Sequence, residues 1–98
     1  MKILALEKDL PGVPPRQFTS QILKEEAKHV WKLHQAGVIR EVYFRADRHA
    51  AVMMLECASL DEARSVLSTL PLIQRKLIDF EVIPLVAYPG FARLFENE

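Results

Sequence analysis

Glu26 and His34 are the two residues whose types and spacing could do chemistry in this sequence. At about 100° per residue, Leu23, Val30 and Leu33 define an apolar helical stripe, and Glu26 projects within it with His34 on the same side. An ionised carboxylate in an apolar setting is costly, so burial raises its pKa toward the range useful for moving protons. Eight residues span two turns, about 12 Å. The pattern therefore predicts one cavity in which Glu26 transfers a proton and His34 assists.

A structural interpretation of the same helix stays open beside the catalytic one. If the apolar stripe is narrower, Glu26 reaches solvent and carries no unusual chemistry. His34 is then a histidine at the edge of the core whose ring bonds to a backbone group. The two interpretations differ in one observable, which is whether the Glu26 carboxyl points into an enclosed space.

Candidate substrate-binding residues follow the helix. Arg40, Tyr43 and Arg45 lie on a predicted strand and could bind an anionic substrate. Strand alternation predicts that Arg40 and Arg45 face opposite sides of the sheet, so at most one of them faces a cavity. His49 lies in the turn before the next strand, where either a substrate contact or simple exposure fits.

Metal and cofactor chemistry find little support in the sequence. The three histidines show no ligand spacing such as His-x-x-x-His, and a single cysteine, Cys57, excludes both a disulfide framework and a four-cysteine zinc site. Cys57 is expected to be a small buried hydrophobe. The three glycines are isolated, so no phosphate-binding loop is present. We expect no cofactor and no metal.

The elements that must position these residues form one predicted domain over residues 1–98. Turn and cap signals predict strands over 3–8, 38–45, 50–57 and 78–87, a long helix over 16–36 ended by Gly37, and a short helix opened by the capping box Ser59–Glu62 and stopped by Pro71. Pro84 suggests a bulge or an edge strand, and one last helical turn is expected over 91–95. This β-α-β-β-α-β order predicts an α+β, ferredoxin-like fold with a four-stranded antiparallel sheet and both helices on one face.

Composition adds an expectation about assembly. Half of the 98 residues are hydrophobic, whereas a chain this short hides only about 60–65% of its unfolded surface. The predicted strands are apolar on both faces, but the two helices can cover only one of them. We expect a homodimer, or a higher homo-oligomer, formed through the open face of the sheet. The alternative is a monomer whose open sheet face is apolar and exposed to solvent.

Charge and hydropathy exclude other partners. The formal net charge is zero, which argues against a nucleic-acid or anionic-membrane binder. No run of about 18 apolar residues occurs, so no membrane span is predicted. The first residues become charged too early for a signal peptide, and a cytoplasmic protein is expected.

The C-terminal half carries three short motifs, Leu70-Pro71-Leu72, Asp79-Phe80-Glu81-Val82 and Tyr88-Pro89. They are similar to the Leu-Pro-Leu, Asp-Ile-Glu-Val and terminal His-Pro of muconolactone delta-isomerases, so the chain resembles that family. The long helix matches in place, with Glu25-Glu26 as the acidic cluster, then Gly37 and Arg40. Two departures stand out: Tyr88 replaces the family's histidine, and Gln74-Arg75-Lys76 replaces an aromatic loop.

The resemblance implies a dimeric α+β barrel in which two ferredoxin-like sheets pair face to face. It also implies proton movement on an unsaturated lactone without cofactor or metal. Glu26 would be the proton carrier, with His34 or Tyr88 assisting and Arg40 or Arg45 holding a carboxylate. The site residues expected are thus Glu26 and His34 as catalytic groups, and Arg40, Tyr43, Arg45, His49 and Tyr88 as substrate-binding groups.

Three functions compete at this point. A cofactor-independent isomerase acting on a small lactone or related acid requires a cavity between the long helix and the sheet. A non-catalytic homo-oligomeric module that binds a small ligand or serves as a scaffold predicts an interior filled by side chains, without converging polar groups. A cofactor-free oxygenase of the same barrel group has only Trp31, Tyr43 and His49 in its favour.

Overall fold

The computed structural model describes residues 1–97 and has the predicted element order. The elements are β1 (Lys2–Asp9), a 3-10 turn η1 (Pro15–Gln17), α1 (Ser20–Gln35), β2 (Ile39–Phe44), β3 (Ala51–Glu56), α2 (Leu60–Leu67), α3 (Pro71–Gln74), β4 (Ile78–Pro84) and a 3-10 helix η2 (Pro89–Phe95).

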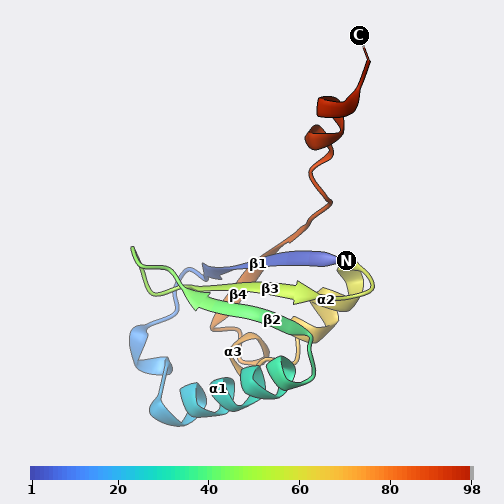
Figure 1. The fold of residues 1–98 in the computed structure, drawn as a ribbon. Helices are drawn as coiled ribbons and strands as arrows, with labels where there is room; N and C mark the ends of the chain where they lie inside the picture. Colours follow the sequence, from blue (N-terminus) through green and yellow to red (C-terminus); the bar gives the residue numbers. More distant parts are fainter. Residues whose placement is uncertain (98) are drawn as a thin grey trace.

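The four strands form one antiparallel sheet in the order β2-β3-β1-β4, with α1, α2 and α3 on one of its faces (Figure 1). The two central strands are therefore β3 and β1, and the two edges are β2 and β4. The expectation of a ferredoxin-like α+β fold is confirmed. Among residues 1–97, none of the helices combines the length and the apolar composition that crossing a membrane requires.

The core lies between the sheet and the helices. Ile3, Ile39, Leu55 and Leu70 are fully buried, and the register places Leu55 opposite both Ile3 and Ile39. Alternate residues of β1 and β3 point into this core, as period-2 patterning requires. The sheet surface that faces α1 is thus formed largely by the two central strands, β1 and β3.

A β-bulge in β2 changes which of its residues face the helices. The pairing steps from Ile39 opposite Leu55 to Glu41 opposite Met54, so Arg40 is an extra residue in the ladder. Simple alternation predicts Ile39 on the face opposite Val42 and Phe44, and this is wrong. Ile39 is fully buried on the helix side, and beyond the bulge Val42 and Phe44 return to that side.

The long helix begins later than expected. Thr19 is its N-cap, and the backbone amide of Ile22 donates to Thr19 Oγ1 at 3.2 Å. The residues from Pro15 to Gln17 form a separate 3-10 turn, so the predicted start at residue 16 is wrong. The predicted end is confirmed, since Gly37 has φ of +80°, the left-handed conformation that closes many helices.

The short helix starts as predicted but ends differently. The amide of Glu62 donates to Ser59 Oγ at 3.1 Å, while the Glu62 carboxylate accepts from the amide of Ala58, one residue before the cap, at 3.0 Å. Pro71 does not stop α2, which ends at Leu67. It occupies the first position of α3, where its missing N–H costs nothing.

The sheet face away from the helices carries apolar side chains on three adjoining strands. Leu4 lies opposite Met54 and Ile83, and Leu6 lies opposite Val52. All five side chains are partly exposed. We call these five residues the open-face patch.

The C-terminal tail lies outside the sheet. The last backbone bond that ties this segment to the body runs from the amide of Leu85 to the carbonyl of Lys2. Pro84 ends β4, an edge strand, which agrees with the expectation for a proline at this position. Beyond it the chain projects away on the side opposite α1 (Figure 1), and Val86 and Phe95 are 91% and 84% exposed.

Candidate functional site

A cavity of about 630 Å³ lies between α1 and the sheet. Its walls are mostly apolar, with side chains such as Leu23, Val30, Trp31, Phe44, Met53 and Phe80. Four polar side chains interrupt this lining: Glu7, Glu26, His34 and His49. A mostly apolar pocket with a few converging polar groups is the usual form of a small-molecule site.

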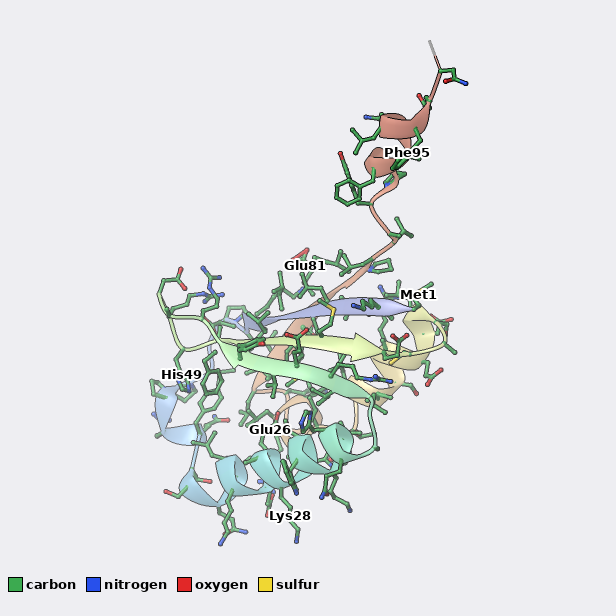
Figure 2. All side chains as sticks on the ribbon, in the orientation of Figure 1. Met1, Glu26, Lys28, His49, Glu81 and Phe95 are labelled. Atoms are coloured by element: carbon green, nitrogen blue, oxygen red, sulfur yellow. The ribbon has the colours of Figure 1, made fainter. Side chains whose placement is uncertain are left out.

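Glu26 extends from α1 toward the sheet, whereas Lys28 of the same helix points outward (Figure 2). Its Oε1 accepts a hydrogen bond of 3.0 Å from the backbone amide of Leu72, in the first turn of α3. Burial raises the pKa of the Glu26 carboxyl, the Leu72 amide lowers it, and the charge of Glu7 raises it further. In the described part of the chain, the other oxygen takes no side-chain or backbone hydrogen bond. Glu26 is thus an oriented carboxyl with one free oxygen.

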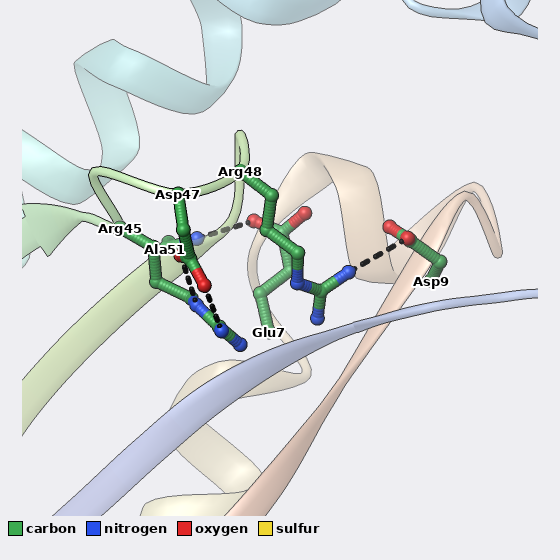
Figure 3. Close-up of polar contacts among 6 residues, drawn as sticks. All are labelled: Glu7, Asp9, Arg45, Asp47, Arg48 and Ala51. Carbon is green, nitrogen blue, oxygen red and sulfur yellow. Dashed lines mark hydrogen bonds and ion pairs between the residues drawn. The ribbon is translucent and has the colours of Figure 1, made fainter.

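Glu7 is a second carboxylate in the cavity, and the sequence interpretation missed it. It lies on β1 on the same face as the buried Ile3 and Ala5, and its Oε1 accepts from the amide of Ala51 at 2.9 Å (Figure 3). The signal was available, because strand alternation from Ile3 places a charged residue inward at position 7. Each of the two carboxylates is thus held by one backbone amide from a different element.

His34 and His49 also line the cavity. His34 Nδ1 donates to the backbone carbonyl of Ile39 at 2.8 Å. The other ring nitrogen, Nε2, takes no part in this bond. This backbone partner is the one that the structural interpretation expected. The His49 ring lies over Phe44 with centroids 4.2 Å apart, at the end of the sheet near η1 (Figure 2).

Two of the remaining predicted residues bond locally on β2. Arg40, the extra residue of the bulge, donates from Nε to the carbonyl of Gly37 at 2.6 Å. The Tyr43 hydroxyl donates to Glu41 at 2.7 Å. Neither side chain belongs to the cavity lining.

Arg45 and Tyr88 also lie outside the lining. Arg45 makes a two-pronged contact with Asp47, at 2.8 and 2.6 Å, in the turn between β2 and β3 (Figure 3). Tyr88 precedes η2 in the tail, packs edge-on against Phe91 and is 67% exposed. The structure therefore brings together Glu26, His34 and His49 of the predicted set, and adds Glu7 and Trp31.

The chemistry open to this arrangement is proton transfer. A half-buried carboxyl with a raised pKa is suited to take and return a proton. Among residues 1–97, no three His, Cys, Asp or Glu side chains gather closely enough to hold a metal ion. Cys57 is buried and free, as expected of a small hydrophobe.

Comparisons with known proteins agree with the fold. The chain is similar in structure to a muconolactone isomerase crystallised at 3.3 Å, with a TM-score of 0.74 and 23% identity over 92% of this chain and 93% of that one. It is also similar to 5-chloro-2-hydroxyhydroquinone dehydrochlorinase from Burkholderia phenoliruptrix AC1100 in complex with 2,5-dihydroxybenzoquinone. That match has a TM-score of 0.61 and 20% identity over 92% and 98% of the two chains.

Sequence comparison gives a consistent result at the level of the family. No curated protein sequence matches the chain significantly. The family described as muconolactone delta-isomerase, however, matches residues 4–90, which include most of β1, every element from η1 to β4 and the four polar residues of the cavity. Since this match spans most of the sequence, the chain belongs to the muconolactone delta-isomerase family.

Proposed function

We propose that the protein is a cofactor-independent isomerase that moves a proton along a small unsaturated lactone or a related carbonyl compound. The observation that carries the proposal is the position of Glu26, a carboxyl of raised pKa inside a cavity large enough for such a molecule. Family membership supports the same reaction class.

The reaction needs one base that can also act as an acid. The free oxygen of Glu26 takes a proton from the saturated carbon next to a conjugated C=C–C=O unit, and the electron pair of that C–H bond becomes the new double bond. The old double bond moves toward the carbonyl as a dienolate, and Glu26 returns the proton to the carbon beside the carbonyl. Substrate and product have the same atoms, so no redox partner is required.

His34 and His49 are the groups proposed to assist. The developing enolate oxygen needs a hydrogen-bond donor. A neutral His49 ring has one N–H to offer, whereas His34 already uses its Nδ1–H on the Ile39 carbonyl and could donate from Nε2 only as an imidazolium. The Ile39 carbonyl fixes the orientation of the His34 ring, and the Phe44 ring supports His49. Both side chains line the same cavity as Glu26.

Self-association belongs to the same proposal. The open-face patch is apolar, faces away from the helices and has no cover within residues 1–97. We propose that a second copy covers it, sheet against sheet, in a homodimer. The lone reduced cysteine fits a cytoplasmic location, where structural disulfides are rare.

A non-catalytic ligand-binding role is the second candidate, and one contact favours it. The Leu72 amide bond gives Glu26 a structural task as the cap of α3, which has no side-chain cap of its own. A cavity with four polar groups argues against the scaffold version of this alternative, which predicts a filled interior.

The test is solvent deuterium incorporation into unsaturated lactones, followed by NMR. Muconolactone and the uncharged β-angelica lactone, both of which carry the conjugated unit, are incubated in D2O with the wild type, Glu26→Gln and Glu25→Gln. We expect the wild type and Glu25→Gln to accelerate exchange and the double-bond shift, and Glu26→Gln to lose about 100-fold or more. Equal rates in all three proteins, or no acceleration with either lactone, would refute the isomerase proposal in favour of the binding role.

A further inference from the structure

The charge of the cavity distinguishes it from a site built for an anionic substrate. Its polar side chains are two carboxylates and two imidazoles, and no Lys or Arg of residues 1–97 contributes to the lining. A site that binds a substrate carboxylate normally presents an arginine, whose planar fork matches the two oxygens. Here the lining instead presents the carboxylates of Glu7 and Glu26, each held by a backbone amide.

Three arginines on β2 and in the turn that follows it bond to other groups of the chain. Arg45 is bound by both oxygens of Asp47, and Arg48 donates to Asp9 at 3.1 Å (Figure 3). Arg40 is turned to the carbonyl of Gly37. Arg45 and Arg48 are thus paired with carboxylates, and none of the three arginines contributes to the cavity lining.

Glu7 adds a negative charge at a fixed place. The Ala51 amide holds one of its oxygens, so the side chain cannot simply swing out to solvent without losing that bond. Glu7 is partly buried and stands close enough to Glu26 for its charge to raise the pKa of that carboxyl. A ligand carboxylate in the same space would meet this charge in a partly dehydrated setting, where repulsion is stronger than in water.

We propose that the cavity selects an uncharged, apolar, enolisable carbonyl compound over its carboxylate-bearing counterpart, and that Glu7 sets this preference. That the ligand is an enolisable carbonyl compound rests on the proposed function. That it is uncharged rests on the residues that line the cavity. Glu7 thus has a specificity role, while Glu26 remains the proton carrier.

The experiment compares two ligands that differ by one charge, muconolactone and its methyl ester. Trp31 is the only tryptophan of the chain and lines the cavity, so its fluorescence reports binding without turnover. We expect the ester to bind the wild type at least about tenfold more tightly than the acid. In Glu7→Gln, which keeps an oxygen for the Ala51 amide, the ratio should fall by about threefold or more.

Glu41→Gln is the matched control. It removes one acidic charge from the same sheet, but Glu41 lies outside the cavity lining, so the ratio should stay at the wild-type value. Urea unfolding of the three proteins verifies that each one is folded during the titrations. An unchanged ratio in folded Glu7→Gln would overturn the role of Glu7.

The outcomes separate this inference from the proposed function. Tighter binding of the ester without any isomerisation would refute the proposed isomerase activity but would still support the charge preference. Tighter binding of the acid, or no binding of either compound, would overturn the charge preference.

Discussion

The carboxylate of Glu26 on α1 and the backbone amide of Leu72 on α3, 46 residues apart in the sequence, are joined by a hydrogen bond of 3.0 Å. The bond ties the helix that carries the proposed proton carrier to the turn that leads into β4. It leaves one carboxylate oxygen free and fixes where that oxygen lies. The same contact thus serves the fold and sets the geometry of the cavity.

The first prediction concerns the pH dependence of stability. The pKa of Glu26 is raised in the folded chain, mainly by burial, so folding favours its protonated form. That contribution is fully present below the unfolded pKa, near 4.5, and is lost as pH rises through the higher folded pKa. Glu26→Gln cannot ionise. We expect its free energy of unfolding, relative to the wild type, to rise between about pH 4 and pH 7 in urea titrations. A pH-independent difference would contradict the raised pKa.

The second prediction separates the two tasks of Glu26. Glu26→Ala removes the acceptor of the Leu72 amide, whereas Glu26→Gln keeps one. We expect the alanine variant to lose about 1 kcal/mol more stability than the glutamine variant, the typical cost of a lost cap. Amide hydrogen exchange at Leu72 should be faster in the alanine variant alone. Equal exchange in both variants would show that the bond does not hold α3.

The third prediction uses two adjacent residues of β3 that face opposite sides of the sheet. Leu55 is fully buried between Ile3 and Ile39, whereas Met54 is partly exposed on the open face. Leu55→Ala should lose about 2–5 kcal/mol of unfolding free energy in urea, because it leaves a cavity in the core. Met54→Ala should lose clearly less. A comparable loss in both would mean that the open face is as well packed as the core.

The fourth prediction tests the covering of the open-face patch. Leu6→Glu places a charge within that patch, opposite Val52 on β3. We expect the wild type to be dimeric at low micromolar concentration by sedimentation equilibrium, and Leu6→Glu to be monomeric, because a buried unpaired charge is costly. Ser65→Glu adds the same charge on exposed α2 and should stay dimeric. A monomeric wild type would contradict sheet-to-sheet pairing.

Local patterns predicted the element order, the cap at Gly37 and the edge position of Pro84, because each depends on a few neighbouring residues. The bulge at Arg40 could not be predicted in this way. It is set by the register of β2 against β3, a long-range pairing that the sequence of β2 alone does not contain. This is why Ile39 was expected on the wrong face.

The cavity residues of α1 and His49 were predicted, whereas Glu7 of β1 was not. Helical spacing placed Glu26 and His34 on one side of α1, and both line the cavity. Glu7 was missed because its charge was used only as evidence against a signal peptide, although strand alternation from Ile3 places it inward. The helix pattern also could not reveal the Leu72 amide, whose position depends on how α3 packs against α1.

The projecting C-terminal tail has a hydrodynamic consequence. The radius of gyration of the chain is 16.4 Å and its extents are 61 × 28 × 22 Å, whereas a compact chain of this length has a radius of about 13 Å. A particle of this outline meets more friction than a sphere of equal mass. In size-exclusion chromatography even a single copy would elute early, at the volume of a heavier compact protein, so only a shape-independent mass measurement can count the copies.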